Sequence, residues 1–295
     1  MRLFIQKLKP ISYRKSFQLC ACLMSLRAVL SVLLLLVRYV PLSCLLITRE
    51  GKQFSDNMQR IFQWSVRGEK FHHLLRQNLE YYVWLMYDTA TAMRKPEKIE
   101  VVGVETLQKH LLQVEKRANP LIMITAHLGN WELLGKYCSL SLDKDFYVLA
   151  KPLDSRWINL AIDYIRELFN IKVLWTKKSN FQKGILKVLN NKQCLGFVMD
   201  QKPEGRIGPK VNFMGKPAEF VAGPAHLAVR YQCPVVSVFC VRIGFHKYRV
   251  ISKILLESDH QQSDIFTLTQ NFAREVEEVI SSYPEQWCWS YKRWK

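Results

Sequence analysis

The sequence predicts an α/β protein with membrane-associated helices at its N-terminus, and three features support this prediction. Its 295 residues are about half apolar, which is enough for one sizeable domain. After Pro96, short apolar runs alternate with amphipathic segments, the order expected of an α/β sandwich. The runs have the length and continuity of buried strands: residues 99–104, 121–125, 146–150, 171–174, 194–199, 235–241 and 248–254.

The first fifty residues contain the best candidate for membrane attachment. Residues 17–37 form an apolar stretch whose only charge is Arg27, long enough for a hydrocarbon core roughly 30 Å thick. A cleaved signal peptide is disfavoured, because no small-residue cleavage site follows this long stretch. Arg27 and the basic residues on both sides favour a helix embedded in the membrane interface over a single span. We therefore divide the chain into a membrane-anchoring segment, residues 1–52, and a main domain, residues 53–295.

Apolar residues at helical spacing predict several helices in the main domain. Residues 53–93 contain no proline, and their apolar positions recur at helical spacing, so we expect two helices joined near Gly68. Ser179 to Gln182 resembles a capping box and precedes a helical apolar face. A late helix carries apolar residues on one face: Ile265, Leu268, Phe272, Val276, Val279 and Ile280.

The formal net charge of +18 draws the protein toward anionic membranes, nucleic acid or acidic protein partners. The sequence contains no paired Cys/His zinc spacing, no aromatic RNA-binding signature and no block of five consecutive basic residues. A nucleic-acid partner is therefore not expected. Anionic lipid and acidic protein remain as the partners that the charge favours.

The cysteines and histidines predict neither disulfides nor a metal site. The eight cysteines lie mostly inside apolar runs, and no CxxC motif occurs. Five histidines lack the spacing of metal ligands: His72, His73, His226, His246 and His260. Reduced thiols indicate a main domain on the cytoplasmic side of a membrane.

His127 and Glu132 are the strongest candidates for chemistry. Residues 121–135 indicate a buried strand that ends at His127 and turns through Gly129 into a helix capped by Asn130. Positions five apart lie about 140° apart on a helix, so the two side chains converge only if His127 precedes the helix. A neutral imidazole can then remove a proton from an alcohol while Glu132 holds the other ring nitrogen. Spacing alone leaves open a purely structural role for both residues.

The sequence disfavours a covalent acyl-serine intermediate, because no GxSxG nucleophile elbow occurs. A thioester donor is reactive enough for direct attack by a hydroxyl group. We expect backbone amides near Gly129 or Gly223 to stabilise the oxyanion that such an attack produces.

The segment AHLGNWELLG, residues 126–135, resembles the catalytic block of the lipid A late acyltransferases, which are lauroyl and myristoyl transferases related to the glycerolipid acyltransferases with their H-x4-D/E pattern. The resemblance covers nearly the whole chain, including the apolar N-terminal segment and Asn57. It departs at Phe62-Gln63, where the family usually has Phe-Pro, and at Lys151, where arginine is more usual. Other matching segments are Lys151 to Asp154 with Arg166, Met199 to Gln201, residues 208–217, Ala222 to Pro224, Pro234 to Arg242 and Tyr283 to Trp294.

The resemblance implies a central mixed β-sheet flanked by helices, with residues 53–295 as an acyltransferase domain. It implies transfer of a fatty acyl group from an acyl carrier protein thioester to a hydroxyl group of a Kdo-bearing lipid A precursor. The reaction would occur at the cytoplasmic face of the inner membrane, without a cofactor, and acyl-CoA is the alternative donor. The acyl carrier protein is acidic, which agrees with the charge of +18.

The resemblance also assigns roles to residues. His127 would be the general base and Glu132 its partner. The expected substrate-binding residues are Lys151, Arg156, Arg166, Asp200, Asn130 and Gly129, with the basic residues near the phosphate of the acceptor.

Several alternatives remain open from the sequence. The acceptor could be a lysophospholipid, a phosphoinositol mannoside or an amino lipid, and a non-catalytic lipid-binding membrane protein is a rival from another class. Asp200 could be a turn cap, and the basic residues could lie on a solvated helix face. The tryptophans near the C-terminus, Trp287, Trp289 and Trp294, either anchor a membrane interface or fill a groove.

Overall fold

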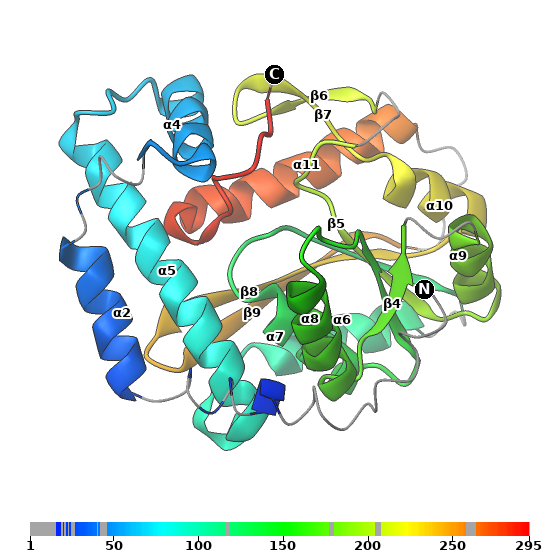
Figure 1. The fold of residues 1–295 in the computed structure, drawn as a ribbon. Helices are drawn as coiled ribbons and strands as arrows, with labels where there is room; N and C mark the ends of the chain where they lie inside the picture. The colour runs from blue at the N-terminus through cyan, green and yellow to red at the C-terminus, as the bar shows by residue number, and fades with distance from the viewer. Residues whose placement is uncertain are drawn as a thin grey trace, which may run out of the picture.

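The computed structural model describes residues 16–18, 20, 22, 24, 27–39, 41, 46–115, 119–176, 180–203, 208–257 and 264–294. Among these residues, seven strands form one mixed sheet with helices on both faces (Figure 1), as predicted. The strand order is β1 (Glu100–Val102), β9 (Lys247–Leu256), β8 (Val235–Gly244), β2 (Leu121–Thr125), β5 (Cys194–Val198), β3 (Phe146–Ala150) and β4 (Lys172–Trp175). All neighbours are parallel except the antiparallel pair β8 and β9.

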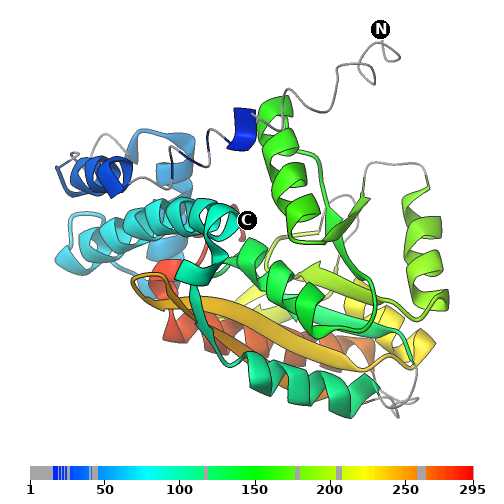
Figure 2. The same ribbon diagram turned by 90° about the horizontal axis from the view of Figure 1, so that it is seen from below.

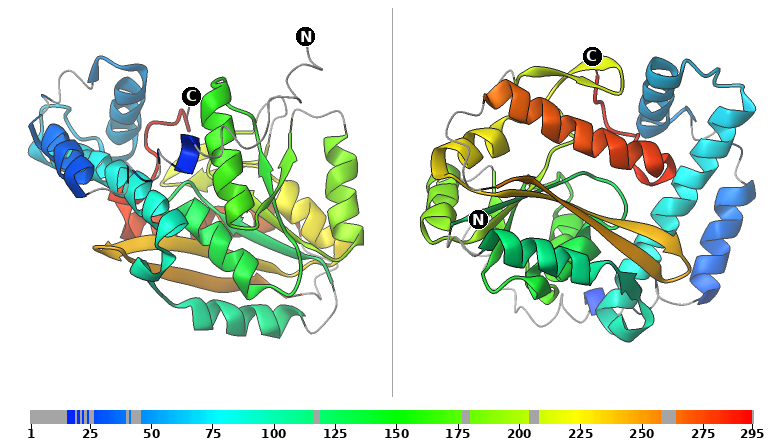
Figure 3. Two further views of the ribbon diagram at one scale, coloured as in Figure 1. Left: turned by 60° about the horizontal axis from the view of Figure 1, so that its bottom comes forward. Right: turned by 180° about the vertical axis from the view of Figure 1, so that it is seen from behind.

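The apolar runs form strands because both faces of the sheet are buried. Alternate residues of β2 enter two separate cores, with Ile122 and Ile124 on one side and Leu121 and Met123 on the other. Figure 3 shows α11 (Ile265–Ser282) and α6 (Val104–Glu115) on opposite faces of the sheet. The first core also takes in α9 (Phe181–Asn190) and α10 (Gly223–Tyr231), and the second takes in α7 (Trp131–Ser141) and α8 (Arg156–Leu168).

Residues 53–93 lie in two helices, as predicted. Helix α4 (Arg49–Phe62) starts at Thr48, whose side chain accepts a hydrogen bond from the Gly51 amide, and α5 (Glu69–Arg94) begins after Gly68. Short 3₁₀ turns at Pro96–Lys98 and Pro284–Gln286 complete the described helices. Because α4 runs across residue 52, the structure places part of the proposed anchoring segment in the same helix as the main domain.

The apolar segment at residues 17–37 is described in part. Helix α2 (Arg27–Tyr39) packs through Leu30 on Val83 and Tyr87 of α5 (Figures 1 and 2). Most of residues 19–26 lie outside the described residues. No helix within the described ranges has both the length and the apolar character needed to cross a bilayer.

The sequence did not predict the hairpin of β6 (Lys210–Phe213) and β7 (Lys216–Glu219). These strands carry lysines and Pro217 rather than a continuous apolar run, because only one face of the hairpin is buried. Val211 and Phe213 are buried, whereas Lys210 and Asn212 are exposed. The feature that could have indicated the hairpin is its two-residue loop. Met214 and Gly215 both have positive φ there, as a two-residue hairpin loop requires.

Candidate active site

His127 and Asp200 come from neighbouring strands and meet at one edge of the sheet. Strand β2 pairs in parallel with β5, with Thr125 opposite Val198. His127 and Asp200 each follow two residues beyond that pair, so the register of the two strands places them side by side. The carboxyl ends of parallel strands are a common place for functional side chains in open sheets.

Asp200 holds His127 through two hydrogen bonds. The Oδ1 atom of Asp200 lies 2.9 Å from Nδ1 of the imidazole and accepts from the His127 amide at 3.1 Å. Its Oδ2 atom accepts from the indole Nε1 of Trp287 at 2.8 Å. The carboxylate is buried, whereas 25% of the His127 side chain is exposed. One ring nitrogen is therefore fixed inside the protein, and the exposed part of the ring is available to a substrate.

The charges of the pair shift both pKa values. Burial works against a charged imidazole, but the charge and hydrogen bond of Asp200 outweigh it and raise the pKa of His127. Glu132 also raises the pKa of His127, and Arg166 opposes this effect. Burial alone would raise the pKa of Asp200, yet the His127 charge and the hydrogen bonds from His127 and Trp287 lower it.

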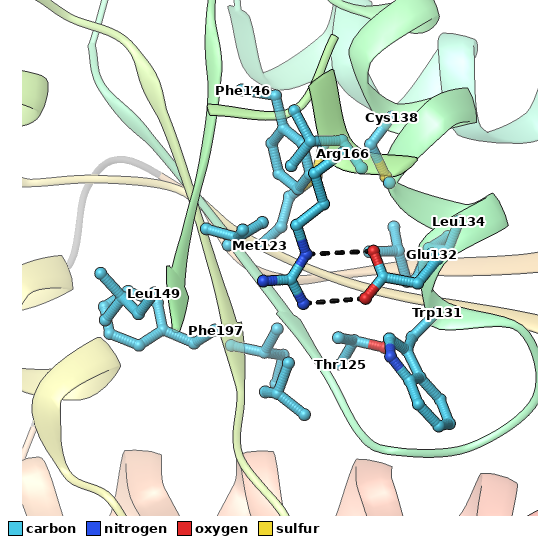
Figure 4. Close-up of a pocket in the computed structure, with 17 residues that line it drawn as sticks. Met123, Thr125, Trp131, Glu132, Leu134, Cys138, Phe146, Leu149, Arg166 and Phe197 are labelled. Atoms are coloured by element: carbon cyan, nitrogen blue, oxygen red, sulfur yellow. Dashed lines mark hydrogen bonds and ion pairs between the residues drawn. The ribbon is translucent and has the colours of Figure 1, made fainter. Parts of the chain in front are cut away.

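Glu132 binds Arg166 and not His127, so the predicted contact between His127 and Glu132 is wrong. Nε and Nη2 of Arg166 donate to the two carboxylate oxygens of Glu132 at 3.1 and 2.8 Å (Figure 4). Glu132 lies in the first turn of α7, and Arg166 lies in the last turn of α8. The planar guanidinium fits a carboxylate at two points, which an imidazole cannot do. The predicted role of holding the second ring nitrogen belongs geometrically to Asp200.

A largely apolar pocket lies beside the Glu132–Arg166 pair. Its empty volume is about 510 Å³, counting space open to solvent. Figure 4 shows the ion pair at this pocket together with apolar side chains of β2, β3, β5 and α7. Trp131 lines the pocket and also touches the His127 ring, at 5.3 Å between ring centroids. The pocket therefore adjoins the histidine, with one ion pair at its wall.

Gly129 and Asn130, both predicted to bind substrate, shape the turn between β2 and α7. Gly129 has a φ of +61°, and a Cβ there would lie 2.1 Å from the Cys240 carbonyl oxygen, so only glycine fits. Its amide donates to the Gln286 carbonyl, and the Asn130 amide donates to Cys240. These two amides are bonded within the protein, so the expected role at the oxyanion stays a prediction for other amides near Gly129 or Gly223. Asn130 caps α7 as predicted, through its side chain and the Leu133 amide.

The predicted basic residues are spread from the end of β3 to the last turn of α8. Lys151 follows β3 and is exposed, and Arg156 is the exposed first residue of α8. Ten residues separate Arg156 from Arg166, a rise of about 15 Å along the helix. The structure therefore brings Arg166 to the pocket but not Arg156. Gly223, whose neighbouring amides were expected near the oxyanion, is the first residue of α10. It lies next to the pocket, because a Cβ on Gly223 would be 3.7 Å from Phe197, which lines the pocket.

Sequence reasoning missed the contribution of the C-terminal segment. Trp287, Trp289 and Trp294 are buried, so they fill the first core rather than reaching a membrane interface. Leu128 and Trp287 form an antiparallel bridge, and the Cys288 amide donates to the His127 carbonyl at 3.0 Å. Contacts between segments so distant in the chain leave no periodic signal in the sequence.

Comparison with known proteins finds acyltransferases similar to this chain. Residues 20–295 match the family model described as bacterial lipid A biosynthesis acyltransferase. A phosphatidylinositol mannoside acyltransferase of Mycolicibacterium smegmatis is 23% identical over 205 residues, which cover 68% of this chain and 64% of that protein. The protein of that name from Mycobacterium tuberculosis (strain CDC 1551 / Oshkosh) is 25% identical over 182 residues, covering 59% of this chain and 54% of the relative. The chain thus spans less than two thirds of the length of these relatives.

Proposed function

Because the chain belongs to the bacterial lipid A biosynthesis acyltransferase family, we propose that it transfers a fatty acyl group from a thioester to a lipid hydroxyl. The observation that carries the proposal is the His127–Asp200 pair, in which Asp200 fixes Nδ1 and leaves Nε2 as a base. The imidazole removes the hydroxyl proton while the oxygen attacks the thioester carbonyl carbon. The carbon–sulfur bond then breaks, and the leaving thiolate takes the proton back from the imidazolium.

The pocket beside Glu132 and Arg166 suits the acyl chain, since its walls are mostly aliphatic and aromatic. Arg166 uses Nε and Nη2 for Glu132, and its third nitrogen points away from that carboxylate in Figure 4. We assign this nitrogen to an anionic group of a substrate, such as a phosphate. Lys151 and Arg156 remain secondary candidates for the same acceptor.

The proposed substrates are an acyl donor that carries a thioester and a lipid acceptor that carries a hydroxyl group. We propose an acyl carrier protein as donor, because its acidic surface complements a chain with a net charge of +18. A Kdo-bearing lipid A precursor at the cytoplasmic face of the inner membrane is the first acceptor, in keeping with the family. A phosphatidylinositol mannoside is the second, because the curated relatives carry that name.

The test is a transfer assay with the full chain, lauroyl or myristoyl acyl carrier protein, and each acceptor in turn, read by product mass spectrometry. The wild-type chain should acylate one acceptor, and His127→Ala should lower the rate by about 10²-fold or more. His110→Ala is the matched control, because this histidine lies on α6 and bonds Ser252. Lipid binding without transfer by the wild-type chain, or normal turnover by His127→Ala, contradicts the proposal.

A further inference from the structure

The C-terminal segment, residues 283–294, is fastened against the turn that carries His127. Nδ2 of Asn57 on α4 donates to the Trp289 and Tyr291 carbonyls, each at 2.7 Å. Nδ2 of Asn78 on α5 donates to the Glu285 and Trp287 carbonyls at 2.7 and 2.8 Å. Both amides are buried, so these bonds hold the backbone on each side of Trp287 in one place.

The Trp287 ring is also fixed by packing. It lies edge to face with Trp289, with ring centroids 4.4 Å apart, and with Phe213, at 6.0 Å. Its side chain is 1% exposed, so the ring has no room to turn. The indole N–H therefore has one direction, and it points at Oδ2 of Asp200 at 2.8 Å.

We infer that Trp287 is a positioning residue for acyl transfer, holding Asp200 so that Oδ1 faces Nδ1 of His127. This inference rests on the proposed function, because it names a residue that acts through the proposed base. A tryptophan that only filled the core would leave its N–H on a nearby carbonyl, as Trp289 does with Pro284 at 2.6 Å. Trp287 instead donates to the buried carboxylate that orients His127.

Loss of the indole N–H has a defined electrostatic consequence. The Asp200 carboxylate would keep its bonds to His127 but lose a donor that neutralises part of its charge. The imidazolium beside it would then be better stabilised, so the pKa of His127 should rise.

The other titratable groups near Asp200 do not replace this donor. Tyr81 on α5 donates its hydroxyl hydrogen to the Gly129 carbonyl, and Tyr82 and Cys288 stay protonated and uncharged because burial raises the pKa of each. Arg293 adds a buried positive charge, but it donates to the Glu219 carbonyl. Glu132 and Arg166 act on His127 from α7 and α8 through their charges, and they are bonded to each other rather than to Trp287.

The experiment compares Trp287→Phe with Trp289→Phe in the full chain. Both variants remove one indole N–H from the same buried cluster and keep an aromatic ring, so they control for packing. The pKa of the His127 imidazole is read by NMR of histidine-labelled protein, assigned with His127→Ala. Trp287→Phe should raise it by about half a unit or more, and Trp289→Phe should leave it unchanged. No change in Trp287→Phe, a fall, or an equal shift in both variants overturns the inference.

Kinetics supply the second readout. Trp287→Phe should lower kcat by roughly tenfold with little change in KM, because the lost bond orients the base rather than binding substrate. In the Asp200→Asn background the same substitution should have no further effect on kcat, whereas a packing role would add its full loss again. An additive loss overturns the inference.

Two further measurements test the role of Trp287. If Trp287→Phe does not fold, the indole N–H resonance of Trp287 is compared between the wild-type chain and Asp200→Asn, and it should shift upfield when the carboxylate is removed. An unmoved resonance overturns the inference. If the wild-type chain transfers no acyl group, the proposed function fails, while the imidazole titration still decides whether Trp287 acts on His127.

Discussion

In the proposed mechanism His127 is the base, with one ring nitrogen held and the other open, and the residues that hold the ring come from three parts of the chain. His127 and Asp200 follow adjacent strands, and Trp287 comes from the far end of the sequence. Glu132 and Arg166 stand next to this group as a separate ion pair. The carboxylate that is hydrogen-bonded to the imidazole ring is therefore not the one that the H-x4-E spacing suggests.

The raised pKa of His127 predicts an acidic limit to activity. A general base must be neutral, so kcat/KM should fall as pH drops through a value above the ordinary histidine pKa of ~6.5. Asp200→Asn removes the charge that raises this pKa, and burial then lowers it. The acidic limb of the pH profile should move to lower pH, while kcat falls by about 10²- to 10⁴-fold.

Measurement of kcat/KM from acidic to mildly alkaline pH checks this prediction. Asp143→Asn is a control, since this carboxylate lies in the surface turn after α7, and it should leave the profile in place. If the acidic limb of the kcat/KM profile does not move in Asp200→Asn, or moves to higher pH, the assignment of His127 as the titrating base is contradicted.

The sequence located His127 and Asp200 but not their contact. Each residue follows an apolar run, yet only the parallel register of Thr125 with Val198 shows that the two lie side by side. Glu132 was paired with His127 because spacing reports neighbours within one segment, and the competing partner Arg166 lies 34 residues away on another helix. Long-range partners of this kind have no periodic signature.

At the scale of elements, continuous apolar runs were the most reliable guide. β2 and β3 begin and end where the runs at residues 121–125 and 146–150 predict; β2 is buried along almost its whole length, whereas β3 is buried at Phe146 and partly buried beyond it. β8 and β9 extend beyond their apolar runs, since the antiparallel hairpin between them continues the backbone pairing past the core. The β6–β7 hairpin, covered on one face only, was not predicted.

Strand β3 offers a test of the pocket. Val148 lines it and stands opposite Gly196 of β5, where Val148 and the Phe146 ring pack over the glycine. Val148→Phe should enlarge this wall of the pocket and shift the preference toward shorter acyl chains, by roughly tenfold in the ratio of kcat/KM values for lauroyl and palmitoyl donors. A competition assay with mixed acyl donors, read by product mass spectrometry, measures this ratio.

Val148→Ala is the matched control, because it widens the pocket and should shift the ratio the other way. An equal loss of activity with every donor in Val148→Phe would mean that the acyl chain does not lie between β3 and β5. Thermal unfolding of both variants separates this outcome from a damaged core, since overpacking costs about 1–3 kcal/mol.

At the scale of the whole molecule, distant segments meet at the site. Helices α4 and α5 hold the C-terminal segment, and that segment pairs with the turn after β2 at the centre of the sheet. Figure 2 shows α8 projecting from the upper side of the molecule and α2 lying beside α5 at the upper left, with α6 beneath the sheet. Both α2 and α8 expose large apolar side chains: Val32, Leu35, Leu36 and Tyr39 on α2, and Trp157 and Ile158 on α8.

This arrangement predicts attachment to anionic membranes through α2 and α8. The net charge of +18 supplies long-range attraction, and the exposed apolar side chains supply short-range burial in the lipid interface. The full chain should sediment with vesicles that contain phosphatidylglycerol, and binding should weaken as salt rises, because salt screens the charges. Leu35→Asp and Trp157→Asp should each weaken binding severalfold at fixed salt, since a carboxylate enters the interface poorly.

The control for this attachment is Leu112→Asp, which adds the same charge at an equally exposed leucine on α6, with 62% of its surface accessible. Because α6 covers the opposite face of the sheet from α11 and lies away from α2 and α8 in Figure 2, this variant should bind vesicles almost as well as the wild-type chain. Equal losses in all three variants would show that charge alone drives binding, and equal binding to pure phosphatidylcholine vesicles would show that charge contributes nothing. Either result contradicts a lipid-facing surface that combines apolar side chains of α2 and α8 with the positive charge of the chain.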